Sequence, residues 1–132
     1  MQPPNRYKAL VVDDEVALVH LQISFLADIG IAGVGAYSGI EAIHYLQSHD
    51  VDLLISDVRM PGAVDGVKLY EWICQNRSQM IDRFVFVSGD MVGMNVGDFF
   101  LTSTVPRIQK PFLWDDYSNL IEQLLDRRAE AL

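Results

Sequence analysis

The sequence predicts an α/β fold, a doubly wound five-stranded parallel sheet with helices on both faces. Short apolar segments alternate with longer amphipathic ones along the 132 residues. Three of the short segments are hydrophobic throughout, which is typical of strands covered by helices on both faces. Strands and helices that alternate in this way imply right-handed crossovers, and crossovers of this kind build a parallel sheet.

Five short segments are predicted as strands, because each is apolar and is followed by a turn or by polar residues. They are Tyr7–Val12, Ile31–Tyr37, Val51–Ser56, Phe84–Ser88 and Val105–Gln109. The three continuously hydrophobic stretches are Ala9–Val12, Leu53–Ile55 and Phe84–Val87.

The first two helices are bounded by recognisable start and stop signals. Residues Val16–Ile29 carry apolar side chains at helical spacing, and Gly30 ends the pattern. The apolar positions expected to face the core are Leu18, Leu21, Phe25 and Ile29. Ser38 and Glu41 have the spacing of a capping box, which predicts a helix from Ser38 through Leu46.

Three further segments are predicted as helices. Val67–Asn76 places an apolar stripe toward the core, and Phe112–Ala131 repeats apolar residues over several turns. Their apolar positions are Leu69, Tyr70, Ile73 and Cys74 in the first, and Trp114, Tyr117, Leu120, Ile121, Leu124 and Leu125 in the second. Met91–Thr104 has the weakest helical pattern, because turn-forming residues interrupt its first half.

Length and composition predict one folded domain, residues 7–129, with a short N-terminal tail (1–6) and a C-terminal end (130–132). Half of the residues are hydrophobic, so the chain can bury a core and is not expected to be disordered. The formal net charge of −8 makes direct binding of nucleic acid unfavourable.

Cysteine usage and apolar segments indicate where the protein works. The single cysteine, Cys74, excludes an internal disulfide framework. We find no apolar run of about 18 residues and no signal-peptide pattern, so we expect no membrane insertion and a cytoplasmic protein.

Polar side chains gather where the predicted strands end, which is where ligands bind in open parallel sheets. Asp13 and Asp14 follow the first strand and Asp57 the third, so three carboxylates are expected to meet and to require a cation. An all-oxygen ligand set favours Mg²⁺. Lys110 and Ser88, from two further strand ends, suit an anionic group such as phosphoryl, and Asp57 is placed to attack phosphorus.

Four sequence elements together resemble the receiver domain of two-component response regulators, a CheY-like fold of the flavodoxin type. They are Val11-Val12-Asp13-Asp14-Glu15, Ile55-Ser56-Asp57-Val58-Arg59-Met60-Pro61-Gly62, Val87-Ser88-Gly89 and Lys110-Pro111-Phe112. The key residues lie 43, 31 and 22 positions apart, in agreement with that family, and the resemblance covers residues 7–125.

The resemblance implies a phosphorelay function with Asp57 as the phosphoacceptor. The phosphoryl group would come from a histidine of a sensor histidine kinase or a histidine phosphotransfer protein. Asp13 and Asp14 resemble the acidic pair that holds Mg²⁺ together with Asp57, and the backbone carbonyl of Arg59 matches a further metal ligand.

Two other positions match the family's switch. Ser88 corresponds to the residue drawn toward the phosphoryl group, and Lys110 to the lysine that pairs with its oxygens. Phosphorylation would then change the conformation for signal output. Such a domain catalyses only its own phosphorylation and dephosphorylation, so it is not an enzyme in the ordinary sense. Dimerisation is possible, but no distinctive pattern supports it.

The sequence departs from the family pattern at three places. Arg107 stands where an aromatic switch residue is usual, which puts the common hydroxyl-to-aromatic coupling in question. The segment Pro61–Gly66 is one residue longer than the common Pro-x-x-Asp-Gly. Phe99–Pro106 replaces the usual Gly-Ala and is more similar to receivers of hybrid histidine kinases than to those of transcription factors.

Three other functions are alternatives to the receiver-domain hypothesis. A haloacid-dehalogenase-like phosphatase would need Asp-x-Asp after the first strand, where this chain has Asp13-Asp14-Glu15. A flavodoxin-like electron carrier would need a phosphate-binding loop there, and these acids would repel a flavin phosphate. A pseudo-receiver, acting only as an interaction module, is disfavoured because the full set of reactive residues is present.

Overall fold

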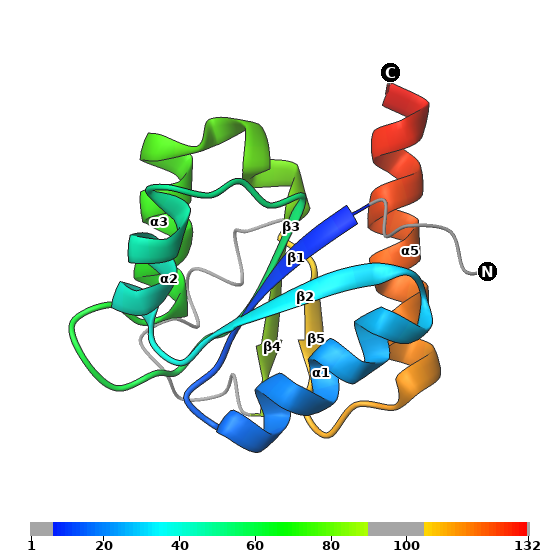
Figure 1. Ribbon diagram of the computed structural model, residues 1–132, viewed down its shortest axis with the longest axis horizontal. Helices are drawn as coiled ribbons and strands as arrows, with labels where there is room; N and C mark the ends of the chain where they lie inside the picture. The colour runs from blue at the N-terminus through cyan, green and yellow to red at the C-terminus, as the bar shows by residue number, and fades with distance from the viewer. Residues whose placement is uncertain (1–6, 90–104, 132) are drawn as a thin grey trace.

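The computed structural model describes residues 7–89 and 105–131, with side chains up to residue 125 (Figure 1). Its strands are β1 (Tyr7–Val12), β2 (Ile31–Ala36), β3 (Leu53–Asp57), β4 (Phe84–Ser88) and β5 (Arg107–Gln109). All pair in parallel, in the order β2-β1-β3-β4-β5. The predicted fold class is therefore confirmed.

The helices cover both faces of the sheet, as Figure 1 shows. One face carries α2 (Gly39–Leu46) and α3 (Gly66–Asn76), and the other carries α1 (Val16–Asp28) and α5 (Trp114–Ala131). Successive strand residues point to opposite faces. In β1, Leu10 faces α2 and α3, whereas Val11 faces α1 and α5, and this explains why the strand is apolar throughout.

Side-chain caps mark the first residues of α2 and α3. The Ser38 hydroxyl accepts a hydrogen bond from the Glu41 amide at 3.1 Å, which confirms the predicted cap of α2. Asp65 caps α3 in the same way, with the Lys68 amide as donor at 2.9 Å. A 3₁₀ helix, η1 (Ser78–Arg83), lies before β4 and has no counterpart in the sequence prediction.

Some predicted boundaries and apolar positions differ in the structure. The strand predicted over Val51–Ser56 runs from Leu53 to Asp57, so Asp57 is itself a strand residue. Leu21 of α1 is 42% exposed and Trp114 of α5 is 40% exposed, so neither belongs to the core. The helix predicted over Met91–Thr104 lies outside the described residues.

A polar residue, Gln22, is buried on the inward side of α1 together with Val19 and Leu26. Its side-chain carbonyl accepts a hydrogen bond from the hydroxyl of Tyr117 in α5 at 3.2 Å. This bond satisfies both polar groups and joins the two helices that cover the same face.

Over the described part of the chain, none of the helices has the length and apolar character needed to span a membrane.

Candidate functional site

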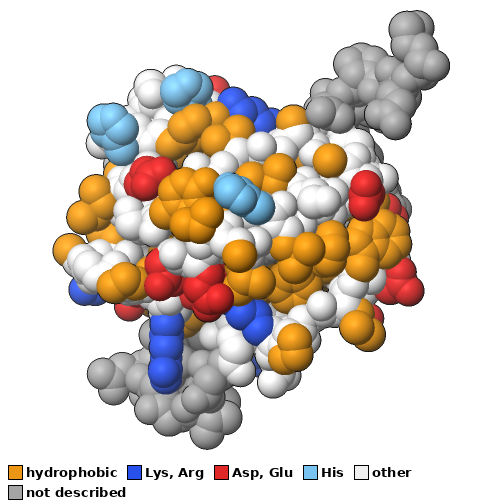
Figure 2. All heavy atoms as spheres, turned by 60° about the horizontal axis from the view of Figure 1, so that its bottom comes forward, with side chains coloured by type: hydrophobic (Ala, Val, Ile, Leu, Met, Phe, Trp, Pro, Cys, Tyr) orange, Lys and Arg blue, Asp and Glu red, His pale blue; other side chains and the backbone are white. Residues whose placement is uncertain are grey.

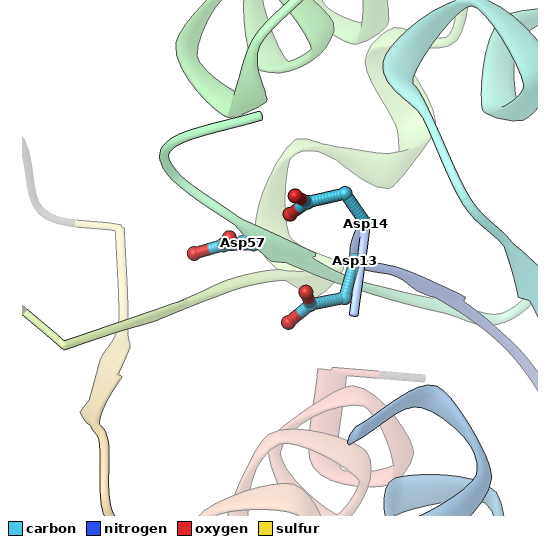
Figure 3. A group of neighbouring side chains, drawn as sticks. All are labelled: Asp13, Asp14 and Asp57. Carbon is cyan, nitrogen blue, oxygen red and sulfur yellow. The ribbon is translucent and has the colours of Figure 1, made fainter. Parts of the chain in front are cut away.

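Three carboxylates meet at the carboxyl ends of β1 and β3. Because these strands pair with Val12 opposite Ser56, the residues that follow, Asp13 and Asp57, are brought side by side. Asp13, Asp14 and Asp57 each offer an oxygen, and these oxygens lie within 4.8 Å of one another. Figure 3 shows the three side chains projecting to the same side of the sheet edge.

Asp13 is the most buried member of the group and is held at both oxygens. Its side chain is fully buried. One oxygen accepts a hydrogen bond from the Glu15 amide at 2.9 Å, and the other accepts one from Lys110 Nζ at 2.8 Å. The turn into α1 therefore orients the carboxylate, and the ammonium group of Lys110, which follows the edge strand β5, neutralises it.

Lys110 reaches the acids from the end of β5. Its amide donates to the Ser88 carbonyl at 2.8 Å, which aligns the segment after β5 with the end of β4. From there Nζ lies 2.8 Å from Asp13 and 3.6 Å from Asp57. Burial by itself would lower the pKa of Lys110, but its hydrogen bond to Asp13 and the charge of Asp57 raise the pKa above its ordinary value, so the amine is a cation.

Asp57 is buried in the sheet edge and its charge is poorly compensated. The residue is 7% exposed. Burial, with the charges of Asp13 and Asp14, raises its pKa from 3.8 to about 6, although Lys110 opposes the shift. In the absence of a further cation, the ionised form of Asp57 is destabilised. A carboxylate in this condition is suited to bind a cation or to react with an electrophile.

The two remaining predicted site residues, Ser88 and Arg59, lie at and just beyond the carboxyl ends of β4 and β3. Ser88 is the last residue of β4 and is buried. Arg59, with an exposed side chain, lies two positions after Asp57 in the segment that leads to α3. Arg107, at the position usual for an aromatic residue, begins β5 and has an exposed side chain.

The residues around the acids form a mixed acidic and apolar surface. Figure 2 shows acidic side chains gathered beside hydrophobic ones where the carboxyl ends of the strands come forward. An apolar groove of about 350 Å³ borders the site, lined mainly by Leu18 and Leu21 of α1 and by Pro111 and Phe112 after β5. Sequence reasoning missed this groove, because its two walls are about 90 residues apart in the chain and come together only through the fold.

The donor set fits a hard divalent cation. Three carboxylates, two of them buried, face one lysine, so two negative charges are left uncompensated when all three acids ionise. Mg²⁺ prefers carboxylate and carbonyl oxygens and retains several waters, which the exposed Asp14 leaves room for. The residues present therefore suit the magnesium site that the sequence predicts.

The fold and this acidic edge define a class of protein, and a family comparison identifies it. The profile of the response regulator receiver domain matches residues 9–122. The chain therefore belongs to the receiver domains of response regulators, the phosphoacceptor modules of two-component signalling.

Known relatives agree with this assignment. The chain is 31% identical over 124 residues to response regulator Rre1 of Synechocystis, covering 92% of this chain and 53% of that protein. It is 36% identical over 66 residues to regulatory protein VanRc of Enterococcus gallinarum, covering 50% of this chain and 28% of that protein. A CheY-like receiver domain protein from Methanospirillum hungatei shares the fold, with a TM-score of 0.84 at 22% identity over 96% of this chain and 98% of that one.

The chain spans between 24% and 54% of the length of the first curated relatives it matches. Several of them are transcriptional regulators by name. The similarity to hybrid-kinase receivers rests on Phe99–Pro106, most of which lies outside the described residues, so it stays a prediction.

Proposed function

We propose that this chain accepts a phosphoryl group on Asp57 from a phosphohistidine, in a Mg²⁺-dependent reaction, and changes conformation for signal output. The observation that carries the proposal is the cluster of Asp13, Asp14 and Asp57 oxygens within 4.8 Å, with Lys110 Nζ in reach of two of them. A strand-end carboxylate with a raised pKa and an adjacent lysine is suited to nucleophilic attack on an anionic phosphorus.

Four groups of this chain would hold the metal. The carboxylates of Asp13, Asp14 and Asp57 supply charged oxygens, and the backbone carbonyl of Arg59 supplies a neutral one. When bound, Mg²⁺ supplies positive charge against the phosphoryl oxygens and against the three carboxylates.

The transfer itself is a substitution at phosphorus. A carboxylate oxygen of Asp57 forms the new P–O bond, the P–N bond to the donor histidine breaks, and its electron pair returns to the imidazole ring. Lys110 neutralises a phosphoryl oxygen, and the Ser88 hydroxyl donates to another. Hydrolysis of the acyl phosphate then restores the Asp57 carboxylate, so the domain turns over no separate metabolite.

The surface beside the acids supports a protein as the donor. Val16, two residues after Asp14, is 50% exposed, Leu113, three residues after Lys110, is 72% exposed, and the apolar groove adjoins Lys110. Apolar surface next to a reactive group is typical of an interface with another protein. A sensor histidine kinase or a histidine phosphotransfer protein would present its phosphohistidine there.

Labelling with a small phosphodonor tests the proposal. The chain is incubated with acetyl phosphate and Mg²⁺, and its intact mass is measured. We expect the addition of one phosphoryl group, its loss in Asp57→Asn or after chelation, and its retention in Asp50→Asn, which removes an exposed carboxylate outside the cluster. A folded chain that takes up no phosphoryl group, or one that hydrolyses phosphate monoesters in many turnovers, contradicts the proposal.

A further inference from the structure

The segment between β3 and α3, residues 58–65, joins the acidic cluster to a helix on one face of the sheet. It begins directly after Asp57 and carries Arg59, whose carbonyl is a proposed metal ligand, and a turn at Gly62 with φ of +100°. Since the position of that carbonyl depends on the whole segment, the contacts that hold the segment in place bear on the site.

One end of the segment is fixed against Asp57 itself. The Gly66 amide donates to the Val58 carbonyl at 2.9 Å, and Asp65 caps α3 at this point. A Cβ on Gly66 would collide with the Asp57 carbonyl oxygen and lie 2.8 Å from Val58 Cα. The start of α3 is therefore pressed against the backbone of the reactive residue.

A second contact holds the segment to a different helix. A Cβ on Gly39, the first residue of α2, would collide with the Val64 carbonyl oxygen and lie 2.6 Å from Val64 Cγ1. Gly39 is buried, and Val64 packs against the core cluster between α2, α3 and the sheet. Gly39 is itself held in place, because Ser38 caps α2. Only glycine at position 39 allows this approach, which we call the Gly39–Val64 contact.

We propose that the Gly39–Val64 contact positions the segment carrying Arg59, so that Gly39 and Val64 are positioning residues for the metal site. The inference rests on the proposed function. It assigns a role to two residues that touch neither the acids nor Lys110 in any contact the structure gives. Residues that orient metal ligands from outside the ligand set commonly change metal affinity by ~10–100-fold when they are replaced.

Mg²⁺ affinity measured by calorimetry on the full chain tests this inference. We expect Val64→Ala and Gly39→Ala to weaken Mg²⁺ binding by about tenfold or more. The matched control is Val34→Ala, because Val34 packs against the same core cluster from β2 and is not part of the segment. Urea unfolding should show that Val64→Ala and Val34→Ala lose stability to a similar extent. Only Val64→Ala should also lose affinity for Mg²⁺.

Amide hydrogen exchange without metal provides a second readout. Residues 58–65 should exchange faster in Val64→Ala than in wild type, and this comparison is available even if Gly39→Ala does not fold. If Val64→Ala lowers stability as Val34→Ala does while affinity and exchange stay at wild-type values, the contact is merely structural and the inference is overturned. If the wild-type chain binds no Mg²⁺, the proposed function fails and this inference fails with it. If the wild type binds Mg²⁺ and the variants bind it equally well, only this inference fails, so the two outcomes are distinguishable.

Discussion

Replacing Asp57 by asparagine should stabilise the metal-free protein, although it removes the proposed phosphoacceptor. The pKa of Asp57 is raised from 3.8 to about 6 in the folded state, so at neutral pH folding must ionise a group that prefers its proton there. A shift of about two units corresponds to about 3 kcal/mol at about 1.4 kcal/mol per unit. Asparagine has nearly the same shape and no charge, so it should recover most of this energy.

The magnitude is an upper limit, because the Asp57 side chain retains 9% of its exposure and water screens part of the repulsion. We therefore expect the free energy of unfolding to rise by about 1.5–3 kcal/mol, which corresponds to about 5–10 °C in Tm for a chain of this size. Lys110 keeps its closer bond to Asp13, so the substitution leaves the main ion pair intact.

The stabilisation expected in Asp57→Asn should depend on pH. Because the folded-state pKa lies above the unfolded value, the penalty is absent below about pH 4, grows as pH rises through about 6, and is complete above it. The difference in free energy of unfolding between Asp57→Asn and wild type should follow the same course. Urea unfolding of both proteins in a chelator, at several pH values, measures it.

Asp50→Asn provides the control, because it changes the net charge equally at an exposed position. If both variants gain the same stability, the effect is general charge repulsion rather than burial in the cluster. If Asp57→Asn is no more stable than wild type at neutral pH, or if its advantage persists undiminished at about pH 4, the account of Asp57 is wrong.

Three further predictions concern the cation, the ion pair and a helix cap. Mg²⁺ at about a hundred times its Kd should raise the free energy of unfolding of the wild type by about 2.7 kcal/mol, and thermal melts should show much less of this rise in Asp14→Asn. Lys110→Met leaves buried Asp13 without its cation, so without metal it should lower the free energy of unfolding by about 2–3 kcal/mol in urea, somewhat less than for fully buried pairs. Ser38→Ala removes the acceptor of the Glu41 amide and should cost about 1 kcal/mol in the same assay.

Each of these predictions has a matched comparison. An equal Mg²⁺ response in wild type and Asp14→Asn would place the metal elsewhere. Lys68→Met removes an exposed lysine, and a loss of stability as large as that of Lys110→Met would show that burial of Asp13 is not the cause. Ser24→Ala lies on an exposed face of α1 and should leave stability nearly unchanged; a loss equal to that of Ser38→Ala would argue against the cap.

The sequence allowed the sheet and the acidic edge to be predicted because both depend on local patterns. Continuous apolar strands imply helices on both faces, and the residue after each strand must lie at the common carboxyl edge. Asp13, Asp57 and Lys110 could thus be brought together without knowledge of any distance. The position of Asp57 as the last residue of β3 differed only slightly from the expectation.

What could not be predicted depends on contacts between distant segments. The preference of Lys110 for Asp13 over Asp57 follows from 2.8 Å against 3.6 Å, and spacing along the chain carries no such information. The need for glycine at position 39 arises because Val64, from another segment, approaches its backbone. On α1, Gln22 is buried and Leu21 exposed, since Tyr117 offers the hydrogen bond that satisfies the amide.

The bond between Lys110 and Asp13 also bears on the order in which the protein can fold. Its partners lie 97 residues apart, and β3 and β4 stand between the strands that carry them. During synthesis, a chain that has not yet reached β5 already contains all three carboxylates but lacks this cation. Until the last strand docks, repulsion among the carboxylates destabilises the partly formed sheet, so the final strand contributes charge compensation as well as hydrogen bonds. A truncated chain ending before residue 105 should for this reason depend on divalent cations for folding more strongly than the whole domain does.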